Sequence, residues 1–140
     1  MAYIDTSVLV PYYHPESLSA SAQEALEEID QPTISPLVEL EFCSAFAIKA
    51  RTGELDEASA RRILEALRTH IEEGRYSVVA LEAADYALAR QWISRLSIPL
   101  RAPDALHLAA AFTNDLTLLT ADRALANSAR HFGVEHELIG

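Results

Sequence analysis

Short, continuously apolar segments alternate with longer helical segments along the whole chain, and this alternation limits the possible folds more than any other feature. The segments expected to form strands lie at residues 2–5, 32–35, 76–81, 116–120 and 134–139. Their unbroken apolar runs are typical of strands buried on both faces of a parallel sheet. The sequence therefore predicts an α/β fold, an α/β/α sandwich in which helices cover both faces of a parallel sheet. With 140 residues, the chain is expected to form a single domain over residues 1–140.

Helix formers and boundary residues place helices between these strands. The expected helices lie at residues 18–29, 35–53, 56–74, 82–96, 102–114 and 121–133, with a further short helix after Asp5. The boundary signals are clearest for the helix over 35–53. Ser35 is its predicted N-cap, Pro36 is its first helical residue, and Gly53 marks its end. All four glycines fall at helix ends or at the terminus, which excludes a Gly-rich phosphate-binding loop.

The chain is strongly acidic, with a formal net charge of −10. Taken alone, this charge disfavours a nucleic-acid partner, because an acidic surface repels phosphate. It is also compatible with a solubility surface, a basic protein partner or carboxylates gathered around a metal, and the 11 Lys and Arg residues could still form a local basic patch. No apolar run approaches the ~20 residues of a membrane span. The N-terminus lacks a basic export signal and Cys43 is the only cysteine, so we expect a cytoplasmic protein.

Three aspartates are placed to reach one edge of the predicted sheet. Asp5 and Asp122 each follow a predicted strand, and Asp104 lies in the first turn of the helix over 102–114. Ligands of open parallel sheets bind at the carboxyl ends of the strands. Singly, each aspartate has a structural explanation, as a helix cap or a partner of the helix dipole. Together they favour a shared functional site, because three caps would point into one crevice.

Two glutamates on the helix over 35–53 are harder to assign. Glu41 and Glu39 both have mostly apolar neighbours, so burial patterning does not choose between them. They lie about 200° apart around an α-helix. The spacing shows only that both cannot face the same site.

Four motifs in order along the chain resemble a PIN domain, specifically the VapC toxins of toxin–antitoxin pairs. They are "YIDTSVLV", "ISPLVELEF", "LRAPDALHLAAA" and "LLTADRALA". The third is the most specific, and the resemblance covers essentially the whole chain. It implies that four acidic positions are filled by Asp5, Glu41, Asp104 and Asp122. The family places its glutamate five residues after the Ser-Pro pair, which selects Glu41, whereas Glu39 stands where the family more often has an apolar residue.

The resemblance implies a Mg²⁺- or Mn²⁺-dependent endoribonuclease. Asp5 and Asp104 are then expected to bind the ion directly, with Glu41 and Asp122 acting partly through water, because Mg²⁺ usually retains several waters. Residues expected to orient the carboxylates are Thr6, Ser7 and Thr120. The resemblance further implies a VapB-like antitoxin partner, an RNA substrate and a homodimer.

Other interpretations of the same residues remain open at this point. His107 follows Asp104 by three positions and could join a zinc site, but a core or supporting histidine is favoured because other zinc ligands are missing. An aspartate after the first strand also suits a phosphoaspartyl enzyme, although Ser7 and the solitary Lys49 do not fit that chemistry. A non-catalytic acidic binding module is the other alternative.

Large aromatic and aliphatic side chains are assigned to the core. Trp92 with Ile93 and Leu96, and the pair Tyr12 and Tyr13, are expected to be buried. None of them is assigned to RNA stacking.

Overall fold

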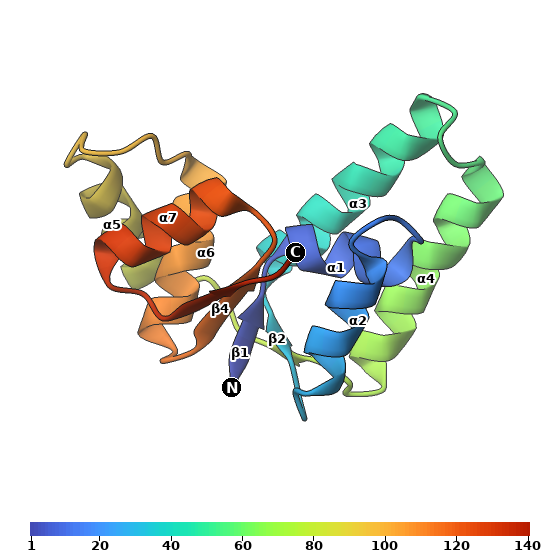
Figure 1. The fold of residues 1–140 in the computed structure, drawn as a ribbon, viewed down its shortest axis with the longest axis horizontal. Helices are drawn as coiled ribbons and strands as arrows, with labels where there is room; N and C mark the ends of the chain where they lie inside the picture. Colours follow the sequence, from blue (N-terminus) through green and yellow to red (C-terminus); the bar gives the residue numbers. More distant parts are fainter.

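A parallel five-stranded sheet forms the centre of the molecule (Figure 1). The computed structural model describes all residues from Met1 to Gly140. The strands are β1 (Ala2–Ile4), β2 (Thr33–Ile34), β3 (Ser77–Val78), β4 (Thr117–Thr120) and β5 (His136–Leu138). Their order is β3-β2-β1-β4-β5, and every neighbouring pair is parallel. The parallel sheet predicted from the apolar runs is therefore confirmed.

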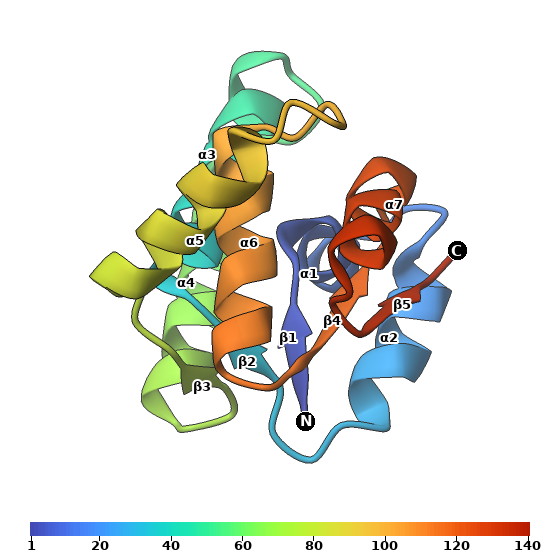
Figure 2. The same cartoon turned by 90° about the vertical axis from the view of Figure 1, so that its left-hand side faces the viewer.

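Seven helices cover the sheet. They are α1 (Thr6–Tyr13), α2 (Ser19–Glu27), α3 (Pro36–Arg51), α4 (Glu57–Glu72), α5 (Ala83–Ile93), α6 (Ala102–Thr113) and α7 (Arg123–Phe132). Helices α5, α6 and α7 lie on one side of the sheet, and α1 to α4 lie on the other (Figures 1 and 2). The α/β/α sandwich is confirmed. No helix combines the length and the apolar character that crossing a bilayer requires.

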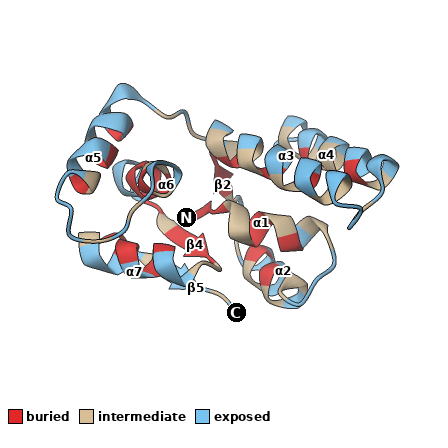
Figure 3. Cartoon of the chain, turned by 90° about the horizontal axis from the view of Figure 1, so that it is seen from above, coloured by how far each residue is buried: buried red, intermediate tan, exposed pale blue.

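The central strand β1 holds the two halves of the sheet together. Its Tyr3 lies opposite Thr33 of β2 and Leu118 of β4. Buried residues concentrate on these three strands and on α6, which is enclosed along most of its length (Figure 3). A single cluster of buried apolar side chains joins the sheet to both helical layers. The carboxyl ends of β1, β2 and β4 are therefore held in place by the packed core.

Four helix N-termini meet at the carboxyl edge of this sheet. Helices α1, α3 and α7 begin two or three residues after β1, β2 and β4 end. Helix α6 leads directly into β4 through a short turn, so its C-terminus lies at the opposite edge and its N-terminus at the carboxyl edge. The acidic residues near these four helix starts are thereby brought to one place.

Most expected elements are shorter than predicted, and the physical reason is clearest for two of them. The strand expected over 76–81 pairs only at Ser77–Val78, because it lies at the edge of the sheet beside a strand of two residues. The helix expected over 82–96 ends at Ile93, where the chain turns and Leu96 adopts a left-handed backbone with φ +57°.

Two residues assigned to the core are exposed. Leu96 is 87% exposed because it lies beyond the end of α5, so its core assignment was wrong. Tyr12 is also exposed, while Tyr13 packs against the core. Trp92 is buried as expected and stacks on Phe132.

Candidate metal centre

Asp5 follows β1 and occupies the N-cap position of α1, yet its side chain does not cap that helix. Its Oδ2 atom accepts hydrogen bonds from Ser7 Oγ at 2.6 Å and from Thr120 Oγ1 at 2.8 Å. No protein group donates to Oδ1, whose nearest basic atom is Nε2 of His107 at 3.8 Å. The capping alternative is therefore wrong for Asp5. One oxygen is held by two hydroxyl groups and the other is available.

The two hydroxyl groups beside Asp5 are themselves held by the turn between β4 and α7. Ser7 Oγ accepts a hydrogen bond from the backbone N–H of Ala121 at 2.9 Å. Thr120 Oγ1 accepts one from the backbone N–H of Asp122 at 3.0 Å. Because a carboxylate oxygen accepts, Ser7 and Thr120 each direct the hydroxyl hydrogen to Asp5 while accepting from the backbone. These contacts tie the start of α1 to the start of α7.

Glu41 reaches the same place from α3. Ser35 accepts a hydrogen bond from Val38 N–H at the start of this helix, and Pro36 occupies its first turn, as predicted. The Oε1 atom of Glu41 accepts from Thr6 Oγ1 at 2.9 Å and contacts Nε2 of His107 at 2.5 Å. No protein group donates to Oε2. Like Asp5, Glu41 has one oxygen held by two partners and one available.

The pKa of Glu41 lies below its usual value. Burial acts to raise this pKa, but the interactions with His107 and the hydrogen bond from Thr6 act in the opposite direction and prevail. Glu41 is therefore ionised at neutral pH.

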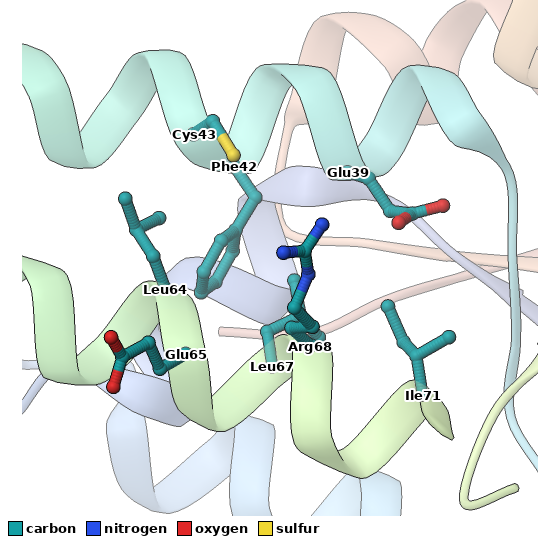
Figure 4. Close-up of a pocket in the computed structure, with 8 residues that line it drawn as sticks. All are labelled: Glu39, Phe42, Cys43, Leu64, Glu65, Leu67, Arg68 and Ile71. Carbon is teal, nitrogen blue, oxygen red and sulfur yellow. The ribbon is translucent and has the colours of Figure 1, made fainter.

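Glu39 points into a different part of the molecule. It lines a groove between α3 and α4 together with Phe42, Cys43 and Arg68, as Figure 4 shows. This groove shares no lining residue with the cleft that contains Glu41. The geometry thus separates the two glutamates that sequence patterning left open.

Asp104 and Asp122 complete the acidic group. Asp104 lies in the first turn of α6 and accepts no hydrogen bond from the protein, and the N-cap position belongs to Arg101. Burial, followed by the charges of Asp122 and Asp5, raises the pKa of Asp104 above its usual value. Asp122 does cap its helix, since its Oδ1 accepts from the N–H groups of Ala124 at 2.9 Å and Leu125 at 3.3 Å. Its Oδ2 has no such partner.

These residues line a single cleft at the carboxyl edge of the sheet. The lining residues are Asp5, Thr6, Ser7, Glu41, Ser44, Ala45, Ile48, Arg101, Asp104 and Asp122. All four acids expected from the sequence are thus brought together, with Thr6 and Ser7 beside them, while Thr120 is buried behind Asp5. Arg101 is the only basic residue in the lining.

A sequence model of the PIN domain matches residues 2–130, almost the full length of the chain. The chain belongs to the PIN domain family. The resemblance seen in the four motifs is confirmed at this level. No curated protein matches the sequence significantly.

Solved structures share this PIN fold at low sequence identity. VapC20 from Mycobacterium tuberculosis, a toxin that cleaves the sarcin-ricin loop, is 14% identical with a TM-score of 0.71, over 91% of this chain and 95% of that chain. VapBC2 from Rickettsia felis, bound to a DNA fragment from its promoter, is 17% identical with a TM-score of 0.73 over 100% of both chains. FitAcB from Neisseria gonorrhoeae is 18% identical with a TM-score of 0.71, over 97% and 96%. At sequence identities this low, the likeness shows that these proteins share a fold with this chain.

The donor atoms of this PIN domain fit a hard divalent cation. Oxygen atoms of Asp5 and Glu41 lie with Nε2 of His107 in a group whose members are all within 4.8 Å of one another. The nitrogen is engaged with Glu41, so the atoms left to bind an ion are carboxylate oxygens. Such oxygens suit Mg²⁺ or Mn²⁺ better than a softer metal. Asp104 and Asp122 line the same cleft outside this closest group.

Sequence reasoning missed two features of this PIN site. Arg101 was overlooked, although it lies one helical turn before Asp104 and its charge acts on both Asp104 and Glu41. The contact between His107 and Glu41 joins residues 66 positions apart. The apolar sequence around His107 indicates that it is buried, but no local pattern reveals its partner.

Proposed function

We propose that this chain is a Mg²⁺- or Mn²⁺-dependent endoribonuclease, and that residues 1–140 form the single PIN domain of a VapC-like toxin. One observation carries the proposal. Four carboxylates from β1–α1, α3, α6 and β4–α7 converge on one cleft, and each retains an oxygen that no protein group occupies. A structural role alone does not require four carboxylates with available oxygens at the edge of a parallel sheet. A cation site on a nuclease fold does.

The residues of the cleft then have distinct tasks. Asp5 and Asp104 are assigned to bind the ion directly, with Glu41 and Asp122 contributing partly through water. Thr6, Ser7 and Thr120 hold the carboxylates in orientation through the hydrogen bonds described above. A bound Mg²⁺ or Mn²⁺ would lower the pKa of a coordinated water and neutralise charge on the phosphate that is attacked.

Arg101 and the ion together reconcile the acidic chain with an RNA substrate. The net charge of −10 opposes association with phosphate. A divalent ion reverses the sign of the local potential in the cleft. Arg101, on the lining of that cleft, is placed to contact a phosphate of the bound strand.

A VapB-like antitoxin is the proposed partner. Several structures with this fold are toxin–antitoxin complexes, including VapBC from Rickettsia felis and from Salmonella typhimurium, both bound to DNA. An antitoxin that inserts an Arg or Lys between the four carboxylates would neutralise the cleft and displace the ion. A homodimer and a cytoplasmic location belong to the same proposal, since a toxin of this kind acts on cellular RNA.

The alternatives have less support. A receiver-type phosphoaspartyl protein needs a lysine beside its aspartate, but the solitary Lys49 lies near the end of α3 and pairs with Glu54 at 2.6 Å. Ser7 also stands where a haloacid-type hydrolase would have its second aspartate. A non-catalytic acidic module would bind a basic partner without cleaving RNA, so metal-dependent cleavage separates it from the nuclease.

The test is cleavage of RNA by the purified chain with Mg²⁺, with Mn²⁺ and with EDTA. Asp5→Asn and Asp104→Asn should each abolish the metal-dependent cleavage and leave the circular dichroism spectrum unchanged. Glu39→Gln is the matched control, because it neutralises a carboxylate on the same protein outside the cleft. Cleavage that survives both EDTA and the two aspartate substitutions would refute the proposal.

A further inference from the structure

A buried row of hydrogen bonds leads from Glu41 into the core. Nε2 of His107 contacts Oε1 of Glu41 at 2.5 Å, and Nδ1 of the same ring lies 2.7 Å from the Tyr3 hydroxyl. The Tyr3 hydroxyl lies 2.7 Å from Oγ of Ser35. The side chain of His107 is only 1% exposed, and Tyr3 and Ser35 are fully buried. The row thus connects Ser35, the N-cap of α3, with the carboxylate of Glu41, which lies about 1.7 turns further along the same helix.

The hydrogen bond that Ser35 accepts as the N-cap of α3 determines which group donates in each hydrogen bond of this row. Ser35 Oγ accepts from the N–H of Val38 at 3.4 Å, and its only other partner is Tyr3. The Ser35 hydrogen therefore goes to the Tyr3 oxygen, since a buried hydroxyl group without an acceptor is costly. Tyr3 must then donate to Nδ1 of His107. Because Nδ1 accepts, the ring hydrogen lies on Nε2 and is donated to Glu41.

We propose that His107 is a positioning residue, held by the Ser35–Tyr3 pair in the tautomer that donates to Oε1 of Glu41 and leaves Oε2 facing the ion. This inference rests on the proposed metal-dependent function. It excludes His107 as a ligand, because a nitrogen that carries a hydrogen has no lone pair for a metal. The same set of three residues could otherwise be mistaken for a two-carboxylate, one-histidine metal site.

The contacts of Glu41 with Thr6 and His107 reduce the entropy that a glutamate side chain loses when it binds an ion. The side chain of Glu41 has three rotatable bonds and is one-third exposed, so it would lose conformational entropy on binding an ion. Thr6 and His107 donate to the same oxygen from different elements, α1 and α6. They fix the carboxylate before the ion arrives. Removal of such supporting contacts in metalloproteins typically lowers metal affinity or activity about 10–100-fold.

The tautomer can be measured directly on the unmodified protein. In ¹⁵N–¹H correlation spectra of the histidine ring, we expect a protonated Nε2 and an unprotonated Nδ1 for His107. Addition of saturating Mg²⁺ should leave that pattern in place. A ring protonated at Nδ1 would contradict the assigned tautomer, and loss of the Nε2 hydrogen when Mg²⁺ binds would show that His107 is a ligand. Either result would overturn the inference.

Substitutions then test the consequence for metal binding in the absence of RNA. His107→Leu fills the space without a donor and should weaken Mn²⁺ binding, measured by electron paramagnetic resonance, about 10-fold or more. His107→Gln keeps an N–H near the position of Nε2 and should restore most of the affinity. Tyr3→Phe removes only the hydroxyl that selects the tautomer and should weaken binding less than His107→Leu does.

Two outcomes separate this inference from the proposed function. If the wild-type chain binds Mn²⁺ and cleaves RNA while His107→Leu retains full affinity, the positioning role is wrong and the nuclease proposal stands. If the wild-type chain binds no Mn²⁺, both fail. Equal losses in His107→Leu and His107→Gln, in variants whose circular dichroism is native, would point to a direct ligand and would also overturn the inference.

Discussion

The hydroxyl of Thr120 donates a hydrogen bond of 2.8 Å to Asp5, although the two residues lie 115 positions apart in the sequence. The bond spans two neighbouring strands, β4 and β1, at the edge where both end. It is directed to Oδ2, the oxygen that Ser7 also contacts. The orientation of the Asp5 carboxylate therefore depends on the pairing of β1 with β4.

Thr120→Val should impair metal-dependent cleavage without unfolding the protein. Valine keeps the shape of threonine but removes the donor to Asp5 and the acceptor for the Asp122 N–H. We expect the Mn²⁺ concentration for half-maximal activity to rise about 10-fold or more. Thr120→Ser should retain nearly normal behaviour. Thr117→Val, on the same strand but far from Asp5, is the control, and an equal effect there would contradict the assigned role.

Substitution of the two glutamates of α3 should have unequal effects. Glu41→Gln removes a charge from the cleft, whereas Glu39→Gln changes the groove between α3 and α4. We therefore expect Glu41→Gln to lower kcat/KM for RNA cleavage at least 10-fold more than Glu39→Gln. Parallel measurement of both variants, with thermal melts to check folding, decides the matter. A larger loss in Glu39→Gln would mean that the assignment of the site to Glu41 is wrong.

Asp104 should destabilise the metal-free protein at neutral pH. Its raised pKa means that the folded state binds this proton more tightly than the unfolded chain does. The folded state is therefore favoured by this group below the unfolded pKa of about 4, and that advantage is lost as pH rises through the folded pKa. Asp104→Asn should melt higher than the wild type in EDTA at pH 7, and the difference should shrink towards pH 4.

The size of this difference is modest. Two unit charges 4 Å apart interact by about 4 kcal/mol at an effective dielectric of 20, and solvent at a half-buried group screens this to the order of 1 kcal/mol. A shift in Tm of about 3 °C is expected for a chain of this size. Mn²⁺ should raise the Tm of the wild type more than that of Asp104→Asn, because the ion binds only the folded site. A variant that melts lower, with no Mn²⁺ response in the wild type, would indicate a purely structural aspartate.

Arg101→Ala should weaken binding of RNA more than it slows the chemical step. The side chain is the only cation on the cleft lining, so its loss removes an attraction for phosphate. We expect KM to rise several-fold with a smaller change in kcat, and the salt dependence of KM to decrease. Arg61→Ala is the control, since Arg61 is exposed and paired with Glu57 away from the cleft. A similar rise in KM for both variants would contradict a specific contact at Arg101.

The sheet, its flanking helices and three of the four acids could be predicted from local pattern and the order of the elements. Glu41 was selected only by the resemblance to PIN domains. Continuous apolar runs mark buried strands, and the Ser35-Pro36 pair marks a helix start wherever it occurs. Asp5, Asp104 and Asp122 were placed by a topological rule, since each lies at the carboxyl edge of a parallel sheet. Such rules need only the order of elements.

The remaining features depend on contacts between distant residues. Leu96 was assigned to the core because the apolar pattern of α5 continues past the point where the chain turns away. The partner of His107 lies on another helix, and the oxygen of Glu41 that it contacts is set by side-chain rotation. The role of Asp122 as both a cap and a cleft residue depends on its two oxygens having different surroundings. No periodicity in the sequence encodes such differences.

The central position of β1 has a consequence for synthesis on the ribosome. Strand β1 is made before the other strands of this sheet and is paired on one side by β2, but its other neighbour, β4, begins only at Thr117. A nascent chain that ends before that residue contains Asp5 and Glu41 but lacks the strand, the Thr120 hydroxyl and the Asp122 carboxylate that complete the cleft. The cleft is therefore assembled only after most of the chain has been translated, when the amino-terminal strand gains its last partner.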